Sequence, residues 1–169
     1  NQWINDTVEI GFGKESLPSY SYFKDYQGTT SFRGLFEDLG SFRSMPNPSL
    51  ANNKGRISWK RAIDVVGKNF DDNVVIDDSY VFVNVTGLSQ DFNNTETEIR
   101  INTDCTDAPI YYSSGVYSTR EEIIANGQIC NETTIPNCTN INCEDNVLTF
   151  TVYQFSGYAY GLNSNLTIN

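Results

Sequence analysis

The chain has 169 residues, 38% of them hydrophobic and 13% aromatic, which is enough apolar surface for a sizeable folded domain. Its 11 basic and 21 acidic residues give a formal charge of -10, so we expect no nucleic-acid partner, because polyanions bind mainly through lysine and arginine. No stretch reaches the roughly 20 consecutive apolar residues of a membrane span.

The first fifty or so residues predict an N-terminal arm. An alternating segment at residues 7–12 is typical of a strand, and an aromatic stretch rich in serine and glycine follows it. Residues 45–55 are dense in proline, asparagine and glycine, which predicts an exposed loop. We therefore assign residues 1–53 to an arm and loop containing strand, and residues 54–169 to a main β-sandwich.

Closely spaced strand signals fill the rest of the chain. Along residues 95–103 isoleucine alternates with charged residues, the pattern of a half-buried antiparallel strand. Residues 79–86 and 147–155 alternate in the same way. Shorter candidates lie at residues 56–59, 62–66, 73–76 and 109–112. This density predicts an all-β fold, an antiparallel β-sandwich of the immunoglobulin-like or jelly-roll-like kind.

One short helix is predicted at residues 119–125, as a connector. Ser118 lies three residues before Glu121, as in a capping box, and Asn126 and Gly127 supply the stop.

Four cysteines lie in the last third or so of the chain, most of them in a loop rich in asparagine, threonine and proline. Their even number predicts two disulfides, and the alternative of a zinc site is disfavoured because the spacings are wide and uneven. Three pairings stay open, with a preference for Cys130 with Cys143 and Cys105 with Cys138.

Six Asn-X-Ser/Thr sequons support a secreted location, although about three or four would arise by chance in this composition. With the cysteines they predict an extracellular, cell-surface protein that carries glycans. The candidate glycosylation sites are Asn5, Asn84, Asn93, Asn131, Asn137 and Asn165.

The chain contains no histidine, which removes the usual general base at neutral pH. Carboxylate pairs could cleave glycosides without it, but the glutamates are better explained as the polar face of a strand (Glu96, Glu98) and a first helical turn (Glu121, Glu122). We therefore expect no enzymatic activity and no cofactor. Calcium is the one ligand that stays possible, because oxygen atoms of acidic turns can bind it; the other interpretation is that these turns are simply solvated. The residues concerned are Asp71, Asp72, Asp77 and Asp78.

Tyrosines are abundant and leave a second function open. On an exposed face they would form a platform that stacks on sugar rings, whereas packing in the sheets is the commoner fate of tyrosine in strands. The candidates are Tyr111, Tyr112, Tyr117, Tyr153, Tyr158 and Tyr160.

The order of these signals resembles the β-sandwich domains of archaeal cell-surface proteins. The residues that carry the resemblance are 55–59, 73–86, 108–110, the cysteine loop and 147–158, so that it covers about residues 54–160. It implies a module of an S-layer, adhesin or filament protein without catalytic residues. The long aromatic arm departs from this pattern and favours a free-standing subunit.

We therefore expect a structural subunit of an extracellular homopolymer, a pilus-like filament or a surface layer, joined by strand addition. The N-terminal arm would pair with a neighbouring sheet edge, with residues 165–169 as a competing donor and pairing within one subunit as the other interpretation. The alternative functions are a monomeric carbohydrate-binding or adhesive module and, third, a small glycosidase. The anchors of the donor strand would be Trp3, Val8, Ile10 and Phe12.

Overall fold

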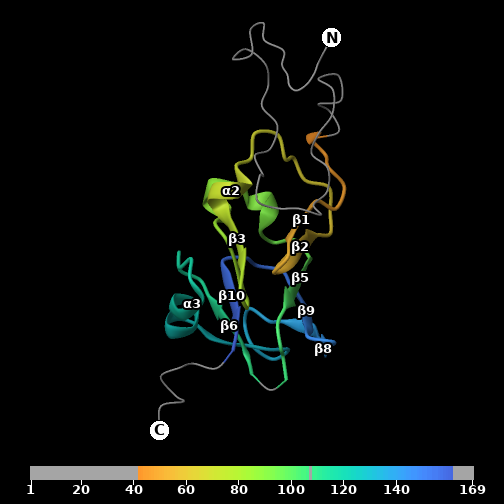
Figure 1. The fold of residues 1–169 in the computed structure, drawn as a ribbon. Helices are drawn as coiled ribbons and strands as arrows, with labels where there is room; N and C mark the ends of the chain where they lie inside the picture. Colours follow the sequence, from red (N-terminus) through yellow and green to blue (C-terminus); the bar gives the residue numbers. More distant parts are fainter. Residues whose placement is uncertain (1–41, 107, 162–169) are drawn as a thin grey trace, which may run out of the picture.

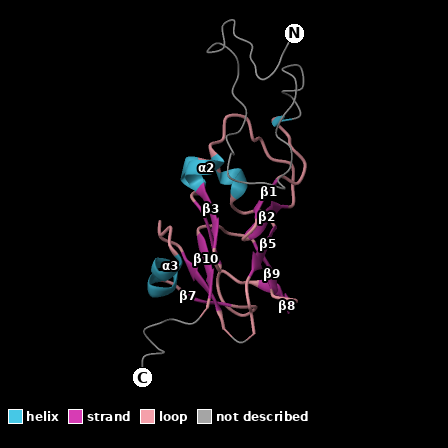
Figure 2. Ribbon diagram, viewed as in Figure 1, coloured by secondary structure: helices cyan, strands magenta, loops and turns pink. Residues whose placement is uncertain are grey.

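The computed structural model describes residues 42–106 and 108–161, which fold into two five-stranded sheets facing each other (Figure 1). Every pair of neighbouring strands is antiparallel. The prediction of an all-β antiparallel sandwich is confirmed. Helices are short and lie outside the two sheets (Figure 2). They are α2 (Phe70–Asn73), α3 (Arg120–Asn126), and the 3-10 turns η4 (Val85–Gly87) and η5 (Gln90–Phe92).

The first sheet has one face on the core and one face in solvent. In its central strand, residues 97, 99 and 101 are buried, whereas the residues between them are half-buried or exposed. This confirms the half-buried strand expected from the alternation of isoleucine and charge. The strands lie in the order β1 (Ser49–Asn52), β2 (Gly55–Trp59), β5 (Thr97–Asn102), β9 (Val147–Val152) and β8 (Thr139–Glu144).

The second sheet is buried on both faces near its centre. Val81 and Val83 pack in the main core between the sheets, as their alternation predicts, while Tyr80 faces a second cluster that contains Ile123 and Ile124 of α3. This helix therefore covers the outer face of the sheet (Figure 1). The strands lie in the order β3 (Val74–Asp77), β4 (Tyr80–Val83), β10 (Gly157–Tyr160), β6 (Ile110–Ser113) and β7 (Gln128–Cys130).

Helix α3 is present, but its cap lies one residue later than predicted. The Thr119 Oγ1 accepts a hydrogen bond from the backbone N–H of Glu122 at 3.2 Å and donates one to its Oε1 at 3.0 Å. Ser118 contributes instead its carbonyl, which accepts from the Tyr80 hydroxyl at 2.9 Å. The stop at Gly127 is confirmed as the C-cap.

The exposed loop predicted at residues 45–55 needs correction, because its residues 49–52 form β1. This strand pairs with β2, and Leu50 at its centre is fully buried. The turn-forming residues serve only the hairpin: Oδ1 of Asn52 accepts from the N–H groups of Lys54 and Gly55 at 2.8 and 3.2 Å. Since β1 precedes residue 53, the first sheet extends into the segment assigned to the arm.

Two strand predictions also need correction. Residues 62–66 form no strand and contribute only an isolated bridge between Ile63 and Met45. The strand expected at residues 79–86 ends at Val83, after which the chain turns into η4. Ile63 and Val65 lie in the core and Val85 packs against it, so the apolar pattern outside the strands reflects burial and not sheet pairing.

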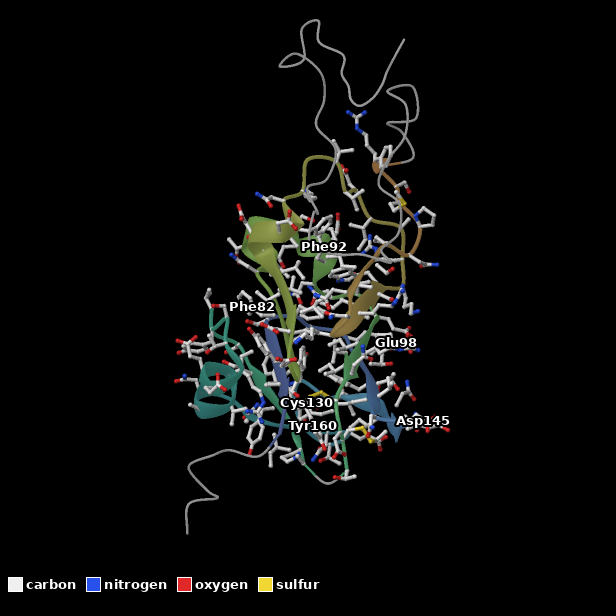
Figure 3. All side chains as sticks on the ribbon, viewed as in Figure 1. Phe82, Phe92, Glu98, Cys130, Asp145 and Tyr160 are labelled. Carbon is white, nitrogen blue, oxygen red and sulfur yellow. A yellow bond between two sulfur atoms is a disulfide. The ribbon has the colours of Figure 1, made fainter. Side chains whose placement is uncertain are left out.

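Aromatic residues fill one end of the core. Trp59 on β2 is fully buried, and its Nε1–H donates to the carbonyl of Phe92 at 3.1 Å. The ring of Phe92, labelled in Figure 3, meets that of Trp59 edge to face, with ring centroids 5.1 Å apart. Phe70 of α2 also packs edge to face with Phe92, with ring centroids 5.6 Å apart, so the short helical turns are held by the core.

Candidate functional site

Two disulfides are present, as the sequence predicts, but the favoured pairing is wrong. Cys105 is bonded to Cys143 and Cys130 to Cys138, with Cα atoms 5.8 and 5.5 Å apart. The loop after β7 folds back, so that the N–H of Cys138 donates to the carbonyl of Asn131 at 3.0 Å, beside Cys130. None of the four cysteines is free, which leaves no thiolate for the zinc alternative.

Strand β8 is the exposed edge of the first sheet. It pairs with β9, and no strand among residues 42–106 and 108–161 lies on its other side. Its residues from Asn140 to Glu144 are all exposed, including Ile141, which keeps 43% of its surface in solvent. The hairpin turn follows at Asp145 and Asn146, both at positive φ, and Asp145 is labelled at the tip in Figure 3.

A β-bulge interrupts this edge near its start. Thr139 pairs with Thr151 and Asn142 with Thr149, so β8 holds one more residue than β9 in this interval. Asn140 within it has a φ of 52°, a left-handed conformation that asparagine tolerates better than most residues. The regular part of the edge therefore runs from Asn142 to Glu144.

Sequence reasoning missed β8 because its side chains are nearly all polar. Residues 139–144 read Thr-Asn-Ile-Asn-Cys-Glu, with no alternation of apolar side chains to indicate a strand. The available signal was the Asp145-Asn146 turn placed directly before the strong apolar alternation of β9.

The edge of the second sheet at β7 is shorter than β8. Strand β7 pairs with β6 and has three residues, of which Ile129 is 46% exposed. The loop closed by Cys130 and Cys138 follows it at once, and Figure 3 shows Cys130 between the two sheets.

The acidic residues considered for calcium fall into two separate pairs. Asp71 and Asp72 lie in the first turn of α2, whereas Asp77 and Asp78 lie at the opposite end of β3. The second pair forms ion pairs with Lys54, whose Nζ lies 4.0 Å from Asp77 and 2.5 Å from Asp78. The hydrogen bond to Asp78 raises the pKa of Lys54. Within the part of the chain that the structure describes, no three potential metal ligands converge.

The glutamates are placed on opposite sides of the sandwich. Glu98 lies on the outer face of the first sheet, where its Oε1 is 3.8 Å from Nζ of Lys60 (Figure 3). Glu121 and Glu122 belong to α3, which covers the outer face of the second sheet. The structure therefore does not bring Glu98 together with the glutamates of the helix.

The tyrosines do not form an exposed platform. Tyr158, Tyr160 and Tyr111 are buried, with 0%, 5% and 8% of their surface exposed, whereas Tyr153 is 49% exposed. The hydroxyl of Tyr158 donates to the carbonyl of Gln154 at 2.6 Å, and burial raises its pKa well above the usual range. Three of the six candidate rings are therefore unavailable to a sugar, and Tyr112 and Tyr117 are half-buried.

The sequons differ in how far their acceptor side chains reach solvent. Asn131 is exposed, whereas Asn84, Asn93 and Asn137 are half-buried. The remaining two, Asn5 and Asn165, lie outside the described residues. The same holds for the proposed donor-strand anchors, Trp3, Val8, Ile10 and Phe12.

Comparison of the chain with family models, curated proteins and solved structures found no match. Among the described residues, no helix is long and apolar enough to cross a membrane.

Proposed function

We propose that this chain is a structural subunit of an extracellular homopolymer, a pilus-like filament or a surface layer, joined by strand addition at the edge of β8. The observation that carries the proposal is this edge, because its residues are exposed and its pairing within the described chain is one-sided. The N–H and C=O groups that point outward from a sheet edge can pair with the backbone of a further strand through main-chain hydrogen bonds.

The cross-links support an extracellular structural role. Disulfides persist in oxidising compartments, and the bond between Cys105 and Cys143 ties β8 to the segment that follows β5. The edge that would receive a donor strand is therefore cross-linked covalently to the body of its own sandwich. The role also agrees with the resemblance to archaeal surface domains.

The bulge limits how a donor strand pairs. A bulge commonly protects an edge against indiscriminate pairing, and here it leaves residues 142–144 regular. The donor engages this run and places an apolar side chain on Ile141, which the free subunit leaves 43% exposed. The alternating anchors Val8, Ile10 and Phe12 suit this geometry, since residues two apart share a strand face.

The test compares four versions of the chain by electron microscopy and sedimentation: the full chain, a version lacking residues 1–12, Ile141→Asp, and the control Val116→Asp. Val116 is 77% exposed and lies between β6 and α3, away from the first sheet. We expect polymers from the full chain and the control, and monodisperse particles from the other two. Circular dichroism and disulfide mapping establish that each version is folded.

Polymers of equal order from Ile141→Asp would refute β8 as the joining edge. Monodisperse particles from all four versions would refute the structural role itself. In that case binding to a glycan array would test the carbohydrate-binding alternative, and a sugar-dependent change in tyrosine fluorescence in solution would support it. The burial of Tyr111, Tyr158 and Tyr160 weakens this alternative.

A further inference from the structure

We infer that, among the four sequons that the structure describes, Asn131 is the preferred acceptor of an N-linked oligosaccharide in the folded chain, and that folding makes Asn93, which lies in an equivalent sequon, inaccessible. The inference rests on the extracellular location proposed above and adds to it the choice between the sequons.

The sequon at Asn131 is fully presented to solvent. Asn131, Glu132 and Thr133 are all exposed. Oδ1 of Asn131 accepts hydrogen bonds from the backbone N–H of Thr133 at 2.9 Å and from its hydroxyl at 2.8 Å. Among the described residues, Nδ2 of Asn131 donates no hydrogen bond. The nitrogen that would carry the sugar is therefore accessible, and the threonine hydroxyl that defines the sequon lies beside it.

The surrounding loop holds this arrangement in place. The disulfide between Cys130 and Cys138 closes a ring with a sequence separation of 8. Within it, the N–H of Asn131 donates to Oγ1 of Thr134 at 2.9 Å, and the carbonyl of Asn131 accepts from the N–H of Cys138 at 3.0 Å. The backbone of Asn131 is thus anchored while its side chain projects from the loop.

The side chain of Asn93, in contrast, makes a hydrogen bond within the fold. Its Oδ1 accepts from the backbone N–H of Phe155 at 2.7 Å, a contact between residues 62 apart in the sequence. The threonine hydroxyl of this sequon is also inaccessible, because Thr95 is only 4% exposed and its Oγ1 donates to the carbonyl of Asp91 at 2.9 Å. A transferase can reach this sequon only after the segment opens.

The other two described sequons are intermediate. Asn84 and Asn137 are half-buried. Asn137 also precedes Cys138, which has no exposed surface and is cross-linked. We expect both to accept less sugar than Asn131.

The modification requires a glycosyl donor activated by a lipid-linked phosphate or diphosphate, and an oligosaccharyltransferase. The bond between C1 of the sugar and the phosphate oxygen breaks, and a bond forms between C1 and Nδ2 of Asn131. A proton of Nδ2 passes to a base of the transferase. The lipid phosphate leaves with the electron pair of the broken bond.

The experiment uses the full oxidised chain, produced without glycans, and a purified oligosaccharyltransferase with its lipid-linked donor. Site occupancy is measured over time by mass spectrometry of the peptides, for the folded chain and for the reduced, unfolded chain. In the folded chain we expect Asn131 to react at least about tenfold faster than Asn93, because Asn93 reacts only from opened states. In the unfolded chain the difference should disappear.

Matched variants separate the sequon from the loop. Asn131→Gln and Thr133→Ala should abolish glycosylation at position 131 of the folded chain, whereas Thr133→Ser should retain it. Asn93→Gln should leave the rate of glycosylation at Asn131 unchanged. Equal rates at Asn93 and Asn131 in the folded chain, or a folded chain unmodified at Asn131, would overturn the inference. If Asn131 is modified but no polymers form, the inference stands and the structural role fails.

Discussion

Replacing Tyr158 with phenylalanine removes one oxygen atom from the core, and the structure gives the size of the effect. The side chain has no exposed surface, and its hydroxyl donates to the carbonyl of Gln154 at 2.6 Å. In Tyr158→Phe this part-buried hydrogen bond is lost, which costs about 1–2 kcal/mol. We expect the free energy of unfolding at pH 7 to fall by about 1.5 kcal/mol and Tm by about 3–6 °C.

The same variant has a defined pH dependence. Burial raises the pKa of Tyr158 in the folded chain above the ordinary 10.0 of the unfolded chain. The stability contributed by the neutral hydroxyl is therefore fully present below about pH 10 and is lost above it, at about 1.4 kcal/mol per pH unit. Tyr158→Phe has no such proton to lose, so its deficit relative to the wild type should vanish near about pH 11.

The assay is urea unfolding followed by far-UV circular dichroism, repeated between neutral and alkaline pH. The control is Tyr153→Phe, in which the ring is 49% exposed, and its effect at pH 7 should stay below about 0.5 kcal/mol. A deficit for Tyr158→Phe that stays constant from neutral to alkaline pH would refute the linkage argument. A variant as stable as the wild type at pH 7 would refute the hydrogen-bond argument.

Three other predictions test the loops and the helix. Peptide mapping of the non-reduced chain should recover Cys105 linked to Cys143. Replacing both cysteines with alanine should lower the free energy of unfolding by about 4 kcal/mol, because the disulfide closes a loop with a sequence separation of 38. An unchanged free energy of unfolding would contradict this prediction. Thr119→Ala should cost about 1 kcal/mol in thermal unfolding and Ser118→Ala less than about 0.5, and equal costs would argue against the observed cap. Gly157→Ala should cost about 1–3 kcal/mol, because its Cβ would lie 2.8 Å from a side chain of α3; a neutral result would mean that the helix can move away.

The sequence by itself determined the architecture wherever a strand has two unlike faces. In β5 and β9 the alternation of apolar and polar residues was read correctly, because the period of two is a local property of extended backbone. The oxidised state of the cysteines followed from their number, and the stop of α3 followed from Gly127.

The tertiary structure decided which segments meet. The disulfide pairing depends on the path of the loop after β7, which brings Cys138 back to Cys130, and no spacing rule contains that path. Whether a tyrosine is buried or exposed depends on the opposite sheet, so Tyr158 and Tyr153 could not be told apart from the sequence. The exposed edge at β8 is decided in the same way: strand order is set by long-range packing, whereas sequence periodicity reports only the local backbone and the faces it presents.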